Sequence, residues 1–130
     1  MKLNYDCLRR LMLEIEDFEN IDENLRYKHL SFADVVKTLP EFKENEIMYV
    51  TLKAKEGGLL NVNVFNADNG IYSCSYSSLT FAGHQFLDNV RSKDIWTKTK
   101  SIAQKIGCTS LRSLISISEK VIFSIIQSQF

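Results

Sequence analysis

The chain has 130 residues, of which 45% are hydrophobic and 25% charged, and its 16 basic and 16 acidic side chains balance. These values are typical of one globular domain and exclude a disordered chain. The three cysteines match no zinc or redox spacing and the N-terminal segment has no apolar run, so we expect free, mostly buried thiols, no signal peptide and a cytoplasmic location. No run of 18 apolar residues occurs, so no membrane partner is expected.

The charges are unevenly spread along the chain. Residues 1–46 carry 7 basic and 11 acidic side chains, whereas residues 91–120 carry 7 basic and 2 acidic ones. A protein that neutralises nucleic-acid phosphates usually has a basic bias, and only the second segment has one. Its charge favours either a phosphate-binding site or an ordinary solvated helix face.

The first part of the chain predicts two helices. The first runs from Tyr5 to Phe18, because apolar residues recur there every three or four positions, and Asn4 can cap it. A loop is expected at residues 20–24, where this periodicity is lost. Ser31 can cap a short second helix, which Pro40 ends because the residue before a proline is disfavoured in helical geometry.

A third helix and a β-hairpin are predicted next. The helix extends from Glu41 to Lys55 and is ended by Gly57-Gly58. Two strands follow, at residues 60–65 and 71–77, in which side chains of different character alternate. Asn69-Gly70 lies between them, and Asn-Gly is the strongest short signal for a hairpin turn.

Three more helices are expected after the hairpin, capped by Thr80, Ser92 and Thr109. Three helices followed by a two-stranded hairpin is the winged-helix arrangement, a variant of the helix-turn-helix. We therefore expect an α+β fold in a single domain, with a winged-helix core at residues 1–78 and a C-terminal helical extension at residues 79–130.

One segment carries a family resemblance. Residues 79–91 spell Leu-Thr-Phe-Ala-Gly-His-Gln-Phe-Leu-Asp-Asn-Val-Arg, and a tryptophan follows. This resembles the pattern Leu-Thr-x-x-Gly-His-x-Phe-Leu-Asp-x-x-Arg of a family of uncharacterised phage and prophage proteins. The resemblance implies a phage or prophage origin and a winged-helix-like fold, and it implies no activity. The motif positions are Thr80, Gly83, His84, Phe86, Leu87, Asp88, Arg91 and Trp96.

Two motif residues have competing interpretations. His84 and Asp88 are four apart on the predicted helix and could interact, which would suit a proton switch or a ligand contact. The alternative is a structural histidine that bonds a nearby backbone group. Trp96 could stack on a nucleic-acid base, or it could be a core residue whose ring is covered by the Lys100 stem.

No catalytic, metal-binding or cofactor-binding constellation is recognisable, and no enzyme activity is expected. The cysteines have no neighbouring base in the sequence, and no nucleophile elbow, phosphate loop or dinucleotide glycine pattern is present. With only two histidines in the chain, a histidine-rich metal site is impossible.

The third helix and the hairpin supply candidate contacts to double-stranded DNA. Lysine can reach phosphate or guanine, and asparagine can recognise adenine. Four glutamates on or beside the same helix would repel phosphate. The candidate contacts are Lys43, Asn45, Thr51, Lys53, Lys55, Asn61, Asn63 and Asn69.

The C-terminal helices supply two further surfaces. The first is a basic patch, which could flank a duplex or dock on an acidic protein: Lys93, Lys98, Lys100, Lys105 and Arg112. The second is the helix at residues 109–128, which is apolar on more than one side and is expected either to form a homodimer or to pack across the domain. Two functions result: a winged-helix DNA-binding regulator of phage type, or an accessory or inhibitor that binds a host protein.

Overall fold

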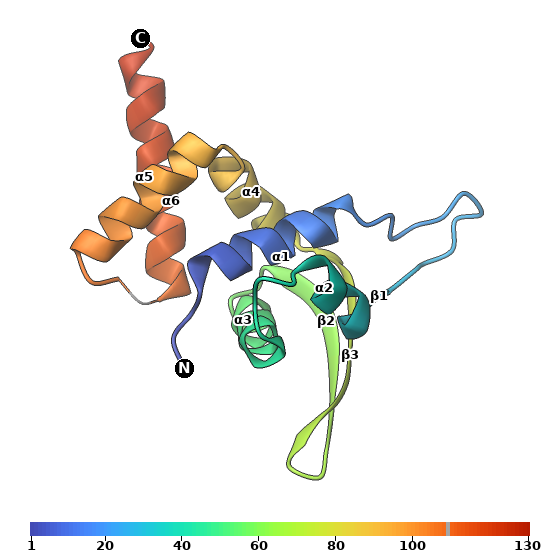
Figure 1. Ribbon diagram of the computed structural model, residues 1–130. Coiled ribbons are helices and arrows are strands. Elements are labelled where there is room, and N and C mark those ends of the chain that lie inside the picture. Colours follow the sequence, from blue (N-terminus) through green and yellow to red (C-terminus); the bar gives the residue numbers. More distant parts are fainter. Residues whose placement is uncertain (109) are drawn as a thin grey trace.

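The computed structural model describes residues 1–108 and 110–130, and it has a mixed α+β fold (Figure 1). Six helices and three strands occur in this part of the chain. In order they are α1 (Tyr5–Asp17), β1 (Leu30–Ser31), α2 (Phe32–Thr38), α3 (Glu44–Glu56), β2 (Leu60–Ala67), β3 (Gly70–Leu79), α4 (Phe81–Val90), α5 (Lys93–Lys105) and α6 (Leu111–Ser128).

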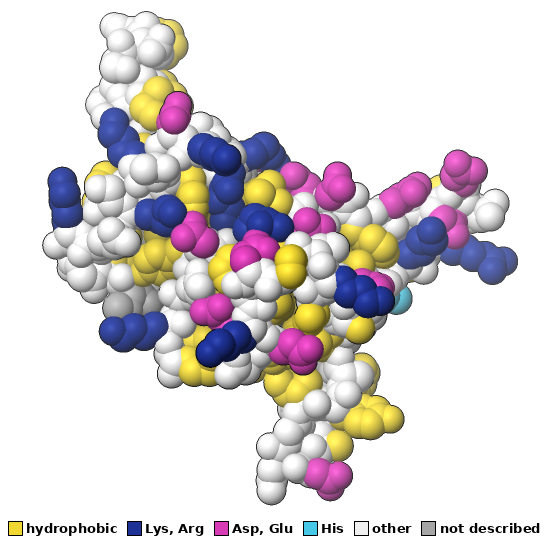
Figure 2. Space-filling view, in the orientation of Figure 1, with side chains coloured by type: hydrophobic (Ala, Val, Ile, Leu, Met, Phe, Trp, Pro, Cys, Tyr) yellow, Lys and Arg dark blue, Asp and Glu magenta, His cyan; other side chains and the backbone are white. Residues whose placement is uncertain are grey.

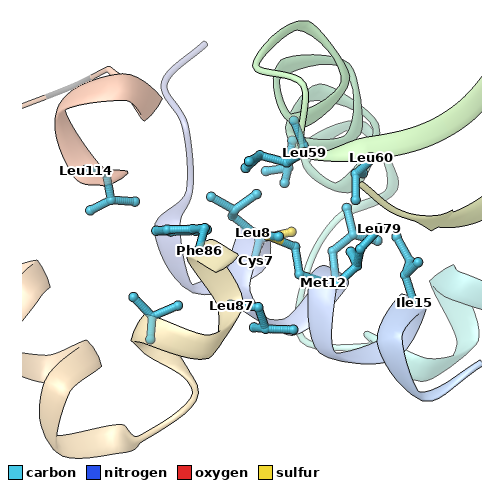
Figure 3. Packing of buried hydrophobic residues seen from close by; sticks show 14 of the residues in the cluster. Cys7, Leu8, Met12, Ile15, Leu59, Leu60, Leu79, Phe86, Leu87 and Leu114 are labelled. Atoms are coloured by element: carbon cyan, nitrogen blue, oxygen red, sulfur yellow. The ribbon is translucent and has the colours of Figure 1, made fainter. Parts of the chain in front are cut away.

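Helix α1 lies at the centre of the molecule and forms the core with elements on both of its sides. Its apolar stripe is buried, as its periodicity predicts. In Figure 3, Met12 and Ile15 point toward Leu60 and Leu79 at the sheet, whereas Leu8 reaches toward residues of α4 and α6. One hydrophobic cluster therefore joins the sheet to the C-terminal helices.

The predicted hairpin is confirmed, with its turn one position earlier than the Asn-Gly pair suggests. β2 and β3 pair antiparallel up to Ala67 and Gly70. The two turn residues are Asp68 and Asn69, with φ of 50° and 62°. Positive φ at both positions is the type I′ geometry that two-residue hairpins prefer, and asparagine and aspartate tolerate it.

The sheet has a third strand that the sequence pattern does not reveal. β1 pairs antiparallel with β3, through Leu30 opposite Tyr76 and Ser31 opposite Ser75, and the strand order is β1-β3-β2. Two residues are too few to show an alternation of side chains. The strand is therefore fixed by its partner and not by its own sequence.

Several predicted helix starts are confirmed, and the predicted start of α3 is wrong. Side chains of Asn4, Ser31 and Thr80 accept the expected capping hydrogen bonds. α3 begins at Glu44 and not at Glu41, because the chain first makes a turn in which the Phe42 N–H donates to the Leu39 carbonyl.

The start of α5 is at the predicted position, and the cap of α6 is a serine. Ser92 occupies the cap position of α5 without a side-chain hydrogen bond. α6 is capped by Ser110, whose hydroxyl accepts from the Ser113 N–H at 3.1 Å. The predicted cap, Thr109, lies outside the described residues.

Candidate interaction surfaces

Gly83 and Thr80 attach the start of α4 to the start of β2. The Thr80 N–H donates to the Leu59 carbonyl at 3.0 Å, and the Thr80 hydroxyl donates to the Gly58 carbonyl. A Cβ atom on Gly83 would lie 2.1 Å from the Leu59 carbonyl oxygen. Only glycine permits this approach, so this motif position is required by packing.

The charged motif residues attach α4 to α1. Arg91 pairs with Asp88 at 2.7 Å and also with Glu16 of α1. His84 does not pair with Asp88: its Nδ1 lies 3.9 Å from the Glu16 carboxylate, and its side chain is half exposed. Asp88 and Glu16 together raise the pKa of Arg91. The contact with Glu16 matches neither the expected pair with Asp88 nor a bond from the His84 side chain to a backbone group.

Arg9 of α1 makes a contact that sequence reasoning missed. Its guanidinium donates to the carbonyls of Val90 at 2.8 Å and Arg91 at 2.6 Å. Carbonyls at the end of a helix have no partner within the helix, so Arg9 satisfies groups at the end of α4. Leu8-Arg9-Arg10 carries a basic pair, but nothing in the sequence identifies the two carbonyls, which are 81 and 82 residues away.

Trp96 is a core residue. It is 4% exposed, and its Nε1–H donates to Asp6 of α1 at 2.9 Å. Lys100 donates to the same carboxylate at 2.8 Å and lies over the tryptophan ring, as its spacing predicts. Partial burial opposes ionisation of Asp6, but the two hydrogen bonds outweigh it and lower the pKa of this carboxyl.

These contacts define one structural unit, which we call the joint: Asp6, Arg9 and Glu16 of α1 with Thr80, Gly83, Arg91, Trp96 and Lys100. Phe86 and Leu87, the apolar motif residues, are buried beside it (Figure 3). Every motif residue in the joint contacts another part of the chain. These motif residues therefore attach the C-terminal helices to α1 and to the start of β2.

The predicted DNA-contact residues separate into a buried one and exposed ones. Thr51 is fully buried, and its hydroxyl bonds the Ile47 carbonyl and the Tyr76 hydroxyl, the latter at 2.7 Å. Its assignment as a surface contact is wrong. Lys53 pairs with Glu56. The remaining predicted residues are exposed: Lys43, Asn45, Lys55, Asn61, Asn63 and Asn69.

Large apolar side chains of the hairpin are exposed, and some of them line a groove with α2 and α3 that Glu44 and Asn45 also border. We call Phe65, Ile71, Tyr72, Phe32 and Met48 the hairpin face. Phe65, Ile71 and Tyr72 are 61%, 40% and 80% exposed. Ile71 and Tyr72 also line a groove of about 310 Å³ together with Phe32 and Met48. Residues 59–79 contain no lysine or arginine and one acid, Asp68. Figure 2 shows this projecting hairpin as hydrophobic and neutral atoms with one acidic side chain.

Comparison with known proteins identifies a family. Residues 2–109 match the family model described as "Hypothetical protein (DUF2513)". The chain belongs to this family. The expectation of an uncharacterised family is thus confirmed, and a phage or prophage origin stays a prediction. No curated protein and no solved structure matches the chain. The matched segment contains the joint and the hairpin face, whereas α6 lies beyond it.

The predicted basic patch lies on α5 and the start of α6. Lys93, Lys98, Lys105 and Arg112 are exposed, whereas Lys100 is held by Asp6 in the joint. Figure 2 shows lysine and arginine side chains gathered over α5, on the opposite side of α1 from the hairpin. The hairpin face and the basic patch therefore lie on opposite sides of α1.

The cysteines are free, as predicted, and two of them are buried. Burial raises the pKa of the Cys7 thiol to about 12 and also raises the pKa of Cys74. Neither thiol is therefore ionised near neutral pH, where a nucleophile would need to be a thiolate. In residues 1–108 and 110–130 no cluster of three metal-ligating side chains occurs, and no helix is long and apolar enough to cross a membrane.

Proposed function

We propose that the chain is a winged-helix module that binds a partner protein through the hairpin face. The order helix, strand, helix, helix, strand, strand and the β1-β3-β2 sheet support the winged-helix assignment. In this assignment α2 and α3 form the helix-turn-helix, the β2-β3 hairpin is the wing, and α4 to α6 are the C-terminal extension.

We favour a protein partner over DNA because the hairpin, residues 59–79, contains no lysine or arginine. A DNA duplex presents about one negative charge per 1.7 Å of its axis, and a wing that follows its backbone must supply positive charge. α3 offers Lys43 and Lys55, but Glu44 and Glu46 lie at its start. Exposed aromatic and large apolar side chains are instead typical of protein interfaces.

A DNA-binding regulator is the second candidate function. The winged-helix order favours it, because this arrangement places α3 for the major groove. The exposed lysines Lys93, Lys98 and Lys105 favour it as well, since they could contact phosphates from α5. A two-fold DNA site would further require the homodimer predicted through residues 109–128, which stays a prediction.

One pair of measurements separates the two candidates. A photoreactive amino acid replaces Tyr72 on the hairpin face or, as the control, Gln104 on exposed α5, and the protein is irradiated in a lysate of its source organism. We expect a discrete protein adduct at position 72, none at position 104, and loss of the adduct when Phe65→Ser is added.

In parallel, fluorescence anisotropy measures binding to a labelled random-sequence duplex at three salt concentrations. We expect no saturable binding near physiological salt. Tight duplex binding that weakens steeply with salt, combined with no adduct at position 72, would contradict protein binding and support the DNA-binding function.

A further inference from the structure

A groove with an apolar floor and a basic rim lies between α5 and α6. Its volume is about 280 Å³. Ile102 of α5 with Ile117 and Val121 of α6 forms the floor, and Lys98 and Lys120 form the rim. Ile102 is 37% exposed, whereas Ile117 and Val121 are nearly buried, so the floor is open to solvent mainly along α5.

A neighbouring hollow between the same two helices shares Lys98 with the groove. This hollow has a volume of about 430 Å³ and adds Ile95 of α5 and Ile125 of α6 to the lining. Ile117, Val121 and Ile125 are four residues apart, so with a rise of about 1.5 Å per residue they span roughly 12 Å along α6. A helical ligand with anchors at positions i, i+3 or i+4, and i+7 covers nearly the same length.

The charges around the groove determine which helix fits it. Lys98 and Lys120 form no salt bridge within the described residues, and residues 91–120 as a whole carry 7 basic and 2 acidic side chains. The two acids are Asp94, which lines the neighbouring hollow, and Glu119, which precedes Lys120 on α6. Among the charged residues that line the groove and the hollow, Lys98 and Lys120 outnumber Asp94, so the rim is positive.

We propose that this groove binds an amphipathic helix of a partner protein, whose apolar stripe is flanked by aspartate or glutamate. Burial of the stripe on the isoleucines and pairing of its acids with the rim lysines would occur together. The site lies across α1 from the hairpin face and does not depend on the function proposed for that face (Figure 1).

A second copy of the chain is a poorer occupant. Residues 121–128, the C-terminal end of α6, contain no acid that could meet the rim lysines. In a two-fold dimer through this groove, the lysine-rich rims of both copies would also approach one another, because a two-fold axis places the same patch on both sides. Like charges in such an interface are unfavourable.

Selection of peptides on the intact chain tests the proposal. The probe is a displayed library of 16-residue amphipathic helices with a fixed apolar stripe and randomised flanking positions. We expect enriched peptides to carry aspartate or glutamate at the flanks. Fluorescence anisotropy should show that K98E/K120E weakens their binding at least 10-fold, whereas K105E, an exposed lysine of α5 outside the groove, changes it less than 2-fold.

Three results would overturn the proposal: no enrichment of any peptide, enrichment of basic or uncharged flanks, or selected peptides that bind K98E/K120E as tightly as the original chain. Analytical ultracentrifugation supplies a fourth. A dimer that the peptides dissociate would show that a second copy occupies the groove. Circular dichroism of K98E/K120E confirms that the variant is folded, as expected for substitutions at exposed positions.

Discussion

The joint and the hairpin face differ in how their side chains are used. In the joint, Asp6 accepts from Trp96 and Lys100, and Arg9 donates to carbonyls of another helix, so these polar groups are satisfied within the chain. On the hairpin face, Phe65 and Tyr72 are exposed and pack on little. The recognisable motif thus belongs to the joint, and the surface available to another molecule has no motif. In this chain, most residues of the distinctive sequence pattern attach one part of the fold to another.

Gly83→Ala should have the largest effect on stability. The added Cβ would overlap the Leu59 carbonyl oxygen, which is backbone and cannot rotate away. We expect a loss of about 3 kcal/mol or more in the free energy of unfolding, measured by urea denaturation followed by circular dichroism. Gln85→Ala, at an exposed position of the same helix, should change it by less than about 0.5 kcal/mol. If Gly83→Ala left the free energy of unfolding unchanged, α4 would not lie against the start of β2.

Thr51→Val should have the next largest effect, because it leaves the buried Tyr76 hydroxyl without its Thr51 partner. An unsatisfied buried polar group costs about 1–3 kcal/mol. The double variant Thr51→Val/Tyr76→Phe should lose less than the sum of the two single variants, as a double-mutant cycle of urea denaturations would show. Additive losses would indicate that the two hydroxyls do not interact. This prediction tests the position of Thr51 in the core, which removes it from the candidate DNA contacts.

A smaller effect is expected from Asp6→Asn, and it should depend on pH. The pKa of Asp6 is lowered in the folded chain from its ordinary value of 3.8, so its ionised form stabilises the fold above that pH. The contribution is lost as pH falls through the lowered pKa. It amounts to at most about 1 kcal/mol, since the carboxylate is more than half exposed.

Urea midpoints at pH 7, 5 and 3 should show the Asp6→Asn deficit shrinking toward low pH. Asp17→Asn, at an exposed position of the same helix, is the matched control and should show no such deficit at pH 7. A deficit that is equal at pH 7 and pH 3 would mean that the charge of Asp6 does not contribute to the joint.

Substitutions on the hairpin face should have the smallest effect on stability. Tyr72→Ser and Phe65→Ser remove side chains that are mostly exposed, so the free energy of unfolding should change by less than about 0.5 kcal/mol. Phe65→Ser should nevertheless abolish cross-linking of the partner from a photoreactive residue at position 72. If either variant unfolds readily, the hairpin face contributes to the fold, and its contrast with the joint fails.

Features that depend on neighbouring residues were predictable from the sequence. The caps at Asn4, Ser31 and Thr80 each need one side chain and a backbone N–H three residues later. The hairpin needs alternating strands and a turn that tolerates positive φ. The apolar stripe of α1 was also evident from its spacing, and it is buried in the structure.

Features that depend on distant residues were not predictable. Glu16 and Arg91 are 75 residues apart, and no spacing rule connects them. Thr51 has a polar side chain on a helix that also carries lysines, which favours the surface, but Tyr76 supplies the partner that allows its burial. The candidate surfaces are equally non-local, because the groove between α5 and α6 exists only once two separate stripes have been placed side by side.

The two hydrogen bonds of Arg9 have a mechanical consequence. They attach the corner between α4 and α5 to α1, and the far side of α1 is packed against the sheet. Helix α1 is therefore held from both sides, by the C-terminal helices and by the sheet. Partners bound at the two proposed surfaces, the hairpin face and the groove between α5 and α6, would lie on opposite sides of this helix.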